Sequence, residues 1–403
     1  MRLLVISHTA HYRRGGQLLA WGPTVRELDH LAGAFGSVTH LAPLHPGPGP
    51  ASVTPYRSGR VELVPLHPSG GDGLTRKLGV ILAAPGYMRA IRRAVLRADV
   101  VQVRCPCNIG LVACLALALH QREPPRWAKY AGNWQPPGPE PLSYRMQRWW
   151  LAKGLHRGPV TVNGEWPGQL PHVHSFVNPC LSEEERRTAA AGTAYKRLEV
   201  PLRLLFVGRV EAAKGAGRAV QVLAGLVSAG VDSTLDLVGD GPERPQFEKL
   251  AVRSGIAGRA TFHGWMSRDR LEDRYRSAHI LLLPSTASEG WPKVLSEAMA
   301  FRTVPLAGLV SSVGQVLKAT GAGLALPPRD VAAFVTAVRE LVDNPTSWEA
   351  LAAKGVEAAG LFTYETHIGR LAEILGLEMP GAGGLGPGAV APAGSASAGG
   401  GPV

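Results

Sequence analysis

The sequence contains only four cysteines in 403 residues, and their spacing fits neither a disulfide framework nor a metal site. We therefore expect free thiols, buried or at strand ends, in a reducing cytoplasm. No apolar run is long enough to cross a bilayer. Residues 1–7 predict a strand rather than a signal peptide, because histidines, arginines and glycines follow immediately. Cysteine content and hydropathy thus argue against disulfide-stapled and membrane-spanning proteins.

Two ligand-binding motifs are also missing. There is no Asp-x-Asp to hold a divalent ion beside a diphosphate, so we expect no metal and no other cofactor. The loops after the first strand of each half, 7–16 and 208–217, lack Gly-x-Gly-x-x-Gly in register. This second absence argues against an NAD-linked oxidoreductase.

Acidic residues are scarce in the first half of the chain. Residues 1–200 carry 24 Lys and Arg against 12 Asp and Glu, which accounts for the whole net charge of +12. We expect this half to meet an anionic partner: a membrane surface, a nucleic acid or a phosphorylated acceptor. Residues 143–157 combine aromatics with cations and predict a basic amphipathic helix. Either this helix lies on an anionic membrane surface, or Trp149 and Trp150 pack into the domain core.

Short apolar runs alternate with helical patterns along the chain, which predicts parallel, doubly wound α/β sheets. The length exceeds what one core usually supports, so we expect two domains. They are predicted over 1–180 and 201–362, joined by a polar linker over 181–200. A final helix over 363–376 and a disordered Gly/Ala/Pro tail over 377–403 follow.

The first loop ends in Gly15 and Gly16, and residues 17–34 carry helical periodicity. A strand, a glycine pair and a helix N-terminus form a geometry that binds phosphate, because glycine lets the backbone approach an anion closely. A plain turn is the alternative for such a pair. His8 and His11, in the same loop, are either substrate contacts or structural residues.

Residues 285–300 are the most informative stretch. They follow the apolar run 279–284, and Pro292 suits the first turn of a helix. A helix that opens at a strand's C-terminal end is the usual ligand position of an open α/β sheet. Glu289 and Glu297 lie eight positions apart, with free helix N–H groups between them that can face an anion. The alternative is an ordinary loop with solvated glutamates.

The segment Glu289-Gly-Trp-Pro292, continued by Ser296-Glu-Ala-Met-Ala300, resembles the donor-site motif of family 4 glycosyltransferases. The resemblance implies the GT-B fold, two Rossmann-like α/β domains with doubly wound parallel sheets that face a central cleft. It implies an acceptor-binding N-terminal domain, a nucleotide-sugar-binding C-terminal domain, and a final helix that crosses back to the first domain. It covers residues 200–376 at the level of motifs and 1–180 only in architecture.

By resemblance, the predicted catalytic residues are Glu289 at the sugar ring, Arg209 and Lys214 at the diphosphate, and Asn133. Arginine offers forked hydrogen bonds and lysine a point charge, so both can offset diphosphate charge. Glu297 would bind the ribose hydroxyls. The other predicted donor contacts are Gly15, Gly16, Gly208, backbone amides at Gly290, Trp291, Val294 and Leu295, and Trp265 beside the base or else in the core.

Three positions depart from the family pattern. Asn133 stands where the family usually carries a histidine; it can hydrogen-bond a hydroxyl but cannot act as an acid or base. Residues 301–303 replace a small residue and glycine, and residues 311–315 replace a Gly-Gly and a glutamate. In retaining enzymes of this kind the donor phosphate is thought to take the acceptor proton, so asparagine is compatible with transfer.

The resemblance therefore implies a retaining hexosyltransferase that moves a sugar from a nucleotide-diphosphate sugar to an acceptor hydroxyl in glycoconjugate biosynthesis. We expect an acceptor sugar or lipid-linked saccharide, and an enzyme in the cytoplasm or at the inner face of the membrane. Two alternatives remain open: a nucleotide-sugar 2-epimerase of the same fold, and a non-catalytic binder of nucleotides or nucleic acids. Only charge supports the last of these, so no nucleic acid is expected.

Overall fold

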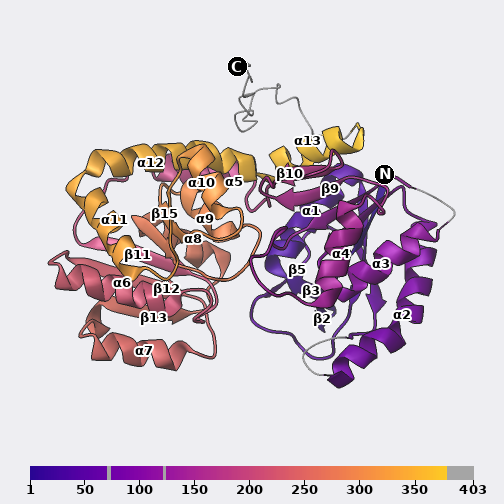
Figure 1. Cartoon of the computed structure of the whole chain (residues 1–403), viewed down its shortest axis with the longest axis horizontal. Coiled ribbons are helices and arrows are strands. Elements are labelled where there is room, and N and C mark those ends of the chain that lie inside the picture. Colours follow the sequence, from indigo (N-terminus) through magenta and orange to yellow (C-terminus); the bar gives the residue numbers. More distant parts are fainter. Residues whose placement is uncertain (70–73, 121–123, 379–403) are drawn as a thin grey trace, which may run out of the picture.

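The computed structural model describes residues 1–69, 74–120 and 124–378, which form two α/β domains side by side (Figure 1). The tail predicted over 377–403 lies outside these residues from 379 onward. Among the described residues, no helix is both long and apolar enough to cross a bilayer. All four cysteines are free and buried, as expected from their spacing.

The N-terminal domain is built on a seven-stranded sheet with the strand order β10-β9-β8-β7-β1-β4-β6. All of its strand pairs are parallel. Because helices cover both faces, several strands are nearly continuous apolar runs. The strands are β1 (Arg2–Ile6), β4 (Ser37–Pro43), β6 (Val61–Leu66), β7 (Val100–Cys105), β8 (Arg126–Tyr130), β9 (Val160–Asn163) and β10 (Val173–Phe176).

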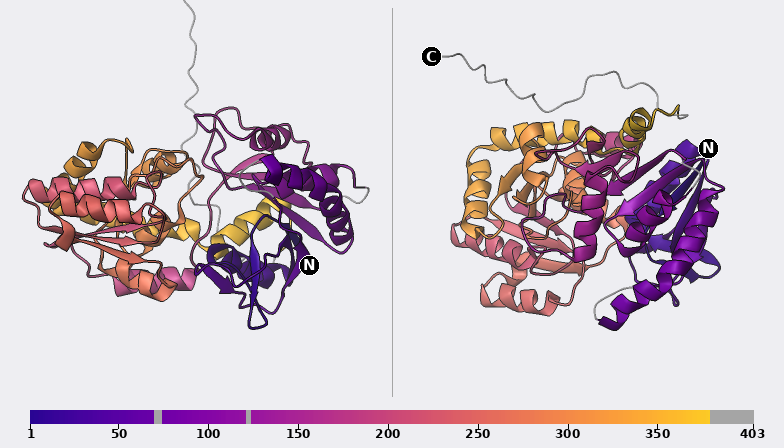
Figure 2. Two further views of the ribbon diagram at one scale, coloured as in Figure 1. Left: turned by 90° about the horizontal axis from the view of Figure 1, so that it is seen from below. Right: turned by 45° about the vertical axis from the view of Figure 1, so that its right-hand side comes forward.

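Side-chain alternation along β1 divides the core of this domain into two layers. Leu4 and Ile6 pack with helices α2 (Leu74–Val95), α3 (Asn108–Ala118) and α4 (Leu142–Ala152). Leu3 and Val5 pack on the other face, with α1 (Gly22–Phe35) and α13 (Tyr364–Leu375). The last helix of the C-terminal part of the chain therefore completes the core of the first domain (Figures 1 and 2).

The segment after β1 differs from the prediction. Residues 17–34 were expected to form one helix, but β2 (His11–Arg14) and β3 (Gln17–Trp21) form an antiparallel hairpin, and the helix begins at Gly22. Gly15 and Gly16 make its turn, with φ of 56° and 80°. Two consecutive positive φ angles are typical of a two-residue hairpin turn and favour a glycine pair. The helix N-terminus predicted directly after Gly15 and Gly16 is therefore wrong, and their predicted donor contact stays a prediction.

β3 also pairs with β5 (Val53–Pro55), so a small three-stranded sheet lies on the N-terminal domain. Residues more than thirty positions away thus stabilise β3 as a strand, and such long-range pairing overrides local helical periodicity.

The C-terminal domain is a second parallel sheet, with the order β13-β12-β11-β14-β15-β16. The chain runs from β11 to β13 in one direction and then returns to β14 on the other side of β11. This reversal creates a crevice at the carboxyl ends of β11 and β14, where open α/β sheets bind ligands. The strands are β11 (Leu202–Val207), β12 (Ser233–Val238), β13 (Ala260–Gly264), β14 (Ile280–Leu283), β15 (Val304–Gly308) and β16 (Leu324–Leu326).

Helices on both faces of this sheet bury a continuous core from Leu202 to Phe362. They are α6 (Ala216–Ser228), α7 (Arg244–Arg253), α8 (Arg268–Ser277), α9 (Lys293–Ala300), α10 (Val313–Thr320), α11 (Val331–Asp343) and α12 (Pro345–Ala358), with short 3-10 turns at Ala257–Arg259 and Ala359–Phe362.

The segment predicted as a linker, 181–200, contains a helix, α5 (Glu183–Gly192). Ser182 and Glu185 close a reciprocal capping box at its start, which is a Ser-x-x-Glu signature readable from sequence but not predicted above. After the helix, the Lys196 ammonium donates to Tyr275 O, Phe301 O and Thr303 Oγ1 at 2.8–3.0 Å. These bonds attach the segment to the C-terminal domain.

Candidate functional site

The two loops at the crevice of the C-terminal sheet lie against each other. Gly215, which has φ of +88°, ends the loop after β11, and a Cβ added there would lie 2.3 Å from Pro284 O. Glycine is therefore required where the loops meet. The amide of Thr286 donates to Ala213 O at 2.9 Å and fastens the loops together. Because α6 and α9 each follow one of these loops, their N-termini lie at the same edge of the sheet, where N–H groups left unbonded can meet an anion.

Charged side chains converge at this junction. Lys214, from the first loop, forms an ion pair with Glu289, from the second. The Lys214 side chain is 20% exposed and that of Glu289 45%, so both reach solvent. Arg209 is 70% exposed and pairs with Glu211 at 2.5 Å. The structure thus brings together Lys214 and Glu289, and places Gly208 and Arg209 in the same loop as Lys214.

Trp291 contributes to the site through its backbone only. Its side chain is 4% exposed and stacks on Phe362 with ring centroids 5.1 Å apart. Its indole N–H donates to Ser296 Oγ at 2.7 Å, within the first turns of α9. Leu295 is fully buried and Val294 packs against the same core. The tryptophan therefore anchors the loop of residues 284–292 after β14, the predicted donor loop, to the core. The Val294 amide lies in the first turn of α9, but the Leu295 amide already donates to Pro292 O at 3.1 Å.

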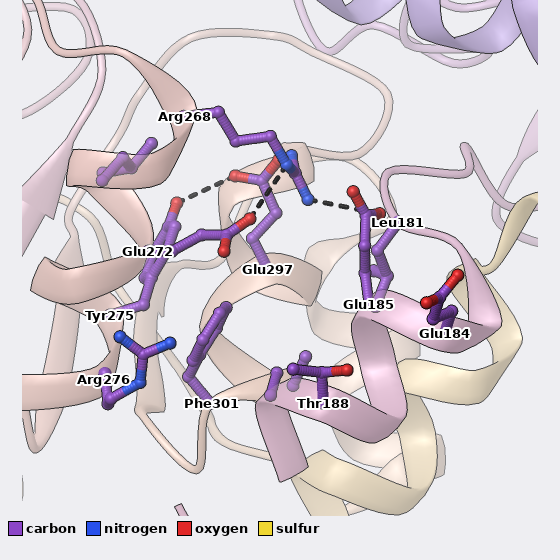
Figure 3. Close-up of a pocket in the computed structure, with 13 residues that line it drawn as sticks. Leu181, Glu184, Glu185, Thr188, Arg268, Glu272, Tyr275, Arg276, Glu297 and Phe301 are labelled. Atoms are coloured by element: carbon purple, nitrogen blue, oxygen red, sulfur yellow. Dashed lines mark hydrogen bonds and ion pairs between the residues drawn. The ribbon is translucent and has the colours of Figure 1, made fainter. Parts of the chain in front are cut away.

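Glu297 lines a separate cavity of about 170 Å³ between α5, α8 and α9 (Figure 3). One carboxylate oxygen accepts from Tyr275 OH at 2.9 Å, and the other lies 3.5 Å from Arg268. Arg268 also pairs with Glu272 at 3.0 Å and Glu185 at 3.4 Å. Burial disfavours its charge, but the three carboxylates outweigh that effect and raise the pKa of Arg268. Glu297 is thus already held by protein groups, and its predicted ribose contact stays a prediction.

Trp265 follows the end of β13 and is 49% exposed, so the alternative that it belongs to the core is wrong. Next to it, His263 Nε2 lies 2.6 Å from Asp236. An exposed indole at the carboxyl end of a strand can stack on a flat ligand. Its place beside a nucleobase remains a prediction.

Asn133 of the N-terminal domain contacts the loop after β14. The amide of Asn133 donates to Ser288 Oγ at 3.0 Å, and its oxygen accepts from Gln135 N at 3.1 Å. Its neighbour Gly132 forms an antiparallel backbone bridge with Glu289. Asn133 therefore lies at the boundary of the two domains, beside a predicted catalytic carboxylate.

The two histidines of the first loop differ in role. His11 is fully buried and hydrogen-bonds Thr9 O at 2.9 Å and Tyr56 OH at 2.8 Å. Burial lowers its pKa to about 4, so it is neutral and structural. His8, two residues after β1, has an exposed surface, and desolvation by the neighbouring protein and the charge of Arg104 lower its pKa. Of the two histidines, only His8 is accessible from solvent.

A buried charge cluster was missed by the sequence analysis. Glu27 of α1 is 3% exposed and accepts from Lys129 Nζ at 2.6 Å and Arg104 Nη2 at 2.9 Å. Lys293, the first residue of α9, lies 3.9 Å away from across the domain boundary. Burial would raise the pKa of Glu27, but the three cations lower it well below its usual range. Burial lowers the pKa of Lys129 to about 8, because it outweighs the attraction of Glu27.

Two departures from the family pattern share one backbone conformation. Arg302 and Ser311 have φ of 53° and 49°, the left-handed region in which glycine is favoured. Arg302 and Ser311 thus adopt a backbone conformation in which glycine would be less strained.

Comparison with known proteins places this site in a family context. Residues 195–358 match the family model described as "Glycosyl transferases group 1". Two proteins of Streptomyces kanamyceticus are similar: an alpha-D-kanosaminyltransferase, 30% identical over 171 residues (42% of this chain, 44% of that protein), and a 2-deoxystreptamine glucosyltransferase, 33% identical over 219 residues (51% and 56%). The chain thus matches about half the length of these curated relatives.

Solved structures match nearly the whole chain. Sucrose-phosphate synthase from Thermosynechococcus elongatus has a TM-score of 0.66 at 19% identity, covering 92% of this chain and 97% of that one. Anabaena HepE in complex with UDP has a TM-score of 0.66 at 16% identity, covering 93% and 100%. The chain therefore has the GT-B fold of two Rossmann-like domains, and its C-terminal domain carries the group 1 glycosyltransferase match.

Proposed function

We propose that this protein is a retaining, metal-independent glycosyltransferase of family 4 that transfers a hexose from a nucleotide-diphosphate sugar to an acceptor hydroxyl. The observation that carries the proposal is the junction of the loops after β11 and β14. There, Lys214 and Glu289 meet beside the N-termini of α6 and α9. The family match over residues 195–358 and the transferase names of the relatives support it.

In this proposal the two ends of the donor are bound by groups of opposite charge at the junction. Lys214, Arg209 and the helix amides bind the diphosphate, and Glu289 accepts hydrogen bonds from the sugar. When the glycosidic bond breaks, negative charge grows on the β-phosphate, and cations fixed in advance stabilise it without reorganising. The ion pair with Lys214 holds Glu289 at the boundary between phosphate and sugar.

Proton transfer follows from the chemistry of the acceptor side. Asn133 offers an amide and cannot take a proton. We therefore assign the acceptor proton to a donor phosphate oxygen, which becomes more basic as the leaving group departs. The new glycosidic bond then forms on the same face from which the nucleotide leaves, and the configuration is retained.

A thermal-shift and product assay tests the function. The protein is screened with UDP, GDP, ADP and TDP and with their sugars, and transfer is followed with candidate acceptors. Stabilisation by one nucleotide family, together with sugar transfer that Glu289→Gln abolishes, supports the proposal. An epimerised donor that accumulates without acceptor would instead establish the 2-epimerase. Nucleotide binding without any turnover would favour a non-catalytic binder.

The acceptor side supports a second, finer proposal, an anionic membrane surface that presents a lipid-linked saccharide. On α4, Leu142, Met146 and Trp149 are 60%, 50% and 55% exposed. Their spacing puts them on one stripe of the helix, with the exposed Arg145 beside them. Trp150 packs against the domain core, as the second alternative from the sequence expected, whereas Trp149 is exposed and its contact with a membrane belongs to this proposal.

Sedimentation with liposomes tests this surface. Wild type should bind vesicles that contain phosphatidylserine and lose binding with Arg145→Glu or Trp149→Ser. Neutral vesicles are the control. The relatives' names contain soluble acceptors, 2-deoxystreptamine and D-inositol 3-phosphate. Full transfer to such a cyclitol, with no vesicle binding, would refute the membrane proposal and leave the transferase intact.

A further inference from the structure

A glutamine of the C-terminal domain bonds to the backbone of the N-terminal domain in both directions. Gln315, in the first turn of α10, accepts from Glu165 N–H at 2.8 Å and donates to Glu165 O at 2.8 Å. Glu165 lies two residues after the end of β9. The oxygen and the NH2 group of one carboxamide thus both hydrogen-bond to the backbone of one residue in the other domain.

A second group of contacts joins the same strand ends to the donor loop. Asn133, after β8, donates to Ser288 Oγ at 3.0 Å, and Gly132 pairs with Glu289 through the backbone. The loop that carries Glu289 therefore pairs with the N-terminal domain through one backbone bridge.

Steric fit adds a third contact at Gly290. A Cβ on this residue would lie 2.3 Å from Asn163 Nδ2 and 2.5 Å from Ala131 O, both in the N-terminal domain. On the opposite side, Ser312 Oγ donates to Gly290 O at 2.6 Å. The donor loop is thus held between the ends of β8 and β9 and the start of α10.

We propose that Gln315 and Asn133 are positioning residues that hold the two domains closed over the donor and fix Glu289 at the reacting sugar. The inference rests on the proposed function and deepens it, since it names side chains outside the donor motif that assemble the site. The carboxamide at position 315 makes both bonds because it carries an acceptor and a donor. A glutamate, which the resembling family commonly carries here, would accept from Glu165 N–H but could not donate to Glu165 O, and its charge would face that oxygen.

The strength of these contacts suits an enzyme that must open to admit substrates. A neutral hydrogen bond contributes about 0.5–1.5 kcal/mol, so losing the reciprocal pair shifts the closed-to-open ratio by roughly tenfold. Where only the closed form is competent, apparent affinity falls in proportion to the closed population, and this fall approaches tenfold as the open form comes to predominate. Donor binding must then supply the lost free energy of closure.

The test compares Gln315→Glu with Gln246→Glu, a matched change on the exposed face of α7. Donor KM and kcat are measured together with the interdomain distance, by pulsed dipolar EPR between labels at Leu119→Cys and Val252→Cys. These two positions are 66% and 65% exposed, whereas the native cysteines are buried and resist labelling.

We expect Gln315→Glu to broaden and lengthen the distance distribution, to raise donor KM about tenfold with a smaller change in kcat, and to leave the melting temperature unchanged. Gln315→Ala should act in the same direction, and Gln246→Glu should behave as wild type. A distance distribution identical to wild type in Gln315→Glu overturns the inference, as does a loss of activity that follows a loss of melting temperature. If the wild type transfers no sugar, the proposed function fails, and the distance measurement still decides whether Gln315 closes the domains.

Discussion

Removing the charge of Glu27 is the sharpest test of how the two domains are held together. The carboxylate is 3% exposed and serves three cations: Lys129 and Arg104 within the N-terminal domain, and Lys293 from the C-terminal domain. Lys129 and Arg104 are only 7% and 13% exposed, so water cannot replace the lost partner. Glu27→Gln keeps the shape and one acceptor oxygen and removes only the charge.

The expected loss follows from the burial of the cations. Breaking a buried ion pair by removing one partner costs about 3–5 kcal/mol. For a domain of this size each kcal/mol corresponds to roughly 2–4 °C, so the melting temperature should fall by roughly 6–20 °C. The matched control is Glu62→Gln, an exposed glutamate on β6, which should change the melting temperature little. Lys129→Met in the Glu27→Gln background should regain part of the loss, because it removes the most buried unpaired cation.

The dependence on pH separates charge from packing. The pKa of Glu27 in the folded protein lies well below its ordinary value of 4.5. The carboxylate therefore stabilises the fold above that pH, and its contribution is lost as the pH falls toward the folded-state pKa. Calorimetry should find the largest difference between wild type and Glu27→Gln near neutral pH, and a vanishing one in acid. A difference below about 1 kcal/mol at neutral pH, or one that persists unchanged in acid, would refute the electrostatic argument.

Three further predictions concern the donor loops. Lys214→Ala should weaken diphosphate binding by roughly 10- to 100-fold, the loss of one charged hydrogen bond, and calorimetry with the nucleotide identified by thermal shift measures it; an unchanged affinity would remove Lys214 from the phosphate site. Glu297→Ala should weaken nucleotide binding by a larger free energy than it takes from the stability of the fold, and wild-type affinity would exclude the ribose contact. Gly290→Ala should abolish transfer while the melting temperature stays within about 2 °C, because the added Cβ meets Asn163 and Ala131 of the other domain rather than its own core; normal activity would show that the domains need not close at this loop.

The C-terminal half was predictable because its signals are local. The apolar run before Pro284, the helix start at Pro292 and the glycines at 208 and 215 each specify one strand, turn or helix end by short-range rules. The prediction at Gln17 failed because the same residues fit two periodicities. A glycine pair followed by Leu18 and Leu19 suits a helix start or a hairpin, and pairing with β5, far along the chain, decides between them.

The charge cluster and the interdomain bonds could not be predicted for a different reason. Glu27, Arg104, Lys129 and Lys293 come from four elements and meet only when both domains have folded and docked. Alternation along β7 and β8 puts Arg104 and Lys129 on one sheet face, the face that α1 covers, but no local pattern says which carboxylate or which helix of the second domain completes the group.

In the proposed mechanism, nucleotide binding depends mainly on contacts within the C-terminal domain, whereas catalysis depends on contacts between the two domains. Lys214 and the N-termini of α6 and α9 belong to the C-terminal domain alone, so a nucleotide can reach them before the domains close, although its apparent affinity increases with the closed population. Glu289 is different, because its loop is bridged to Gly132 and its helix begins with Lys293, which reaches Glu27. Two independent contacts thus make the position of the Glu289 carboxylate depend on the N-terminal domain. A transferase built in this way would admit its donor while open, and would bind it more tightly and become reactive on closing, which protects the activated sugar from water until the acceptor domain is in place.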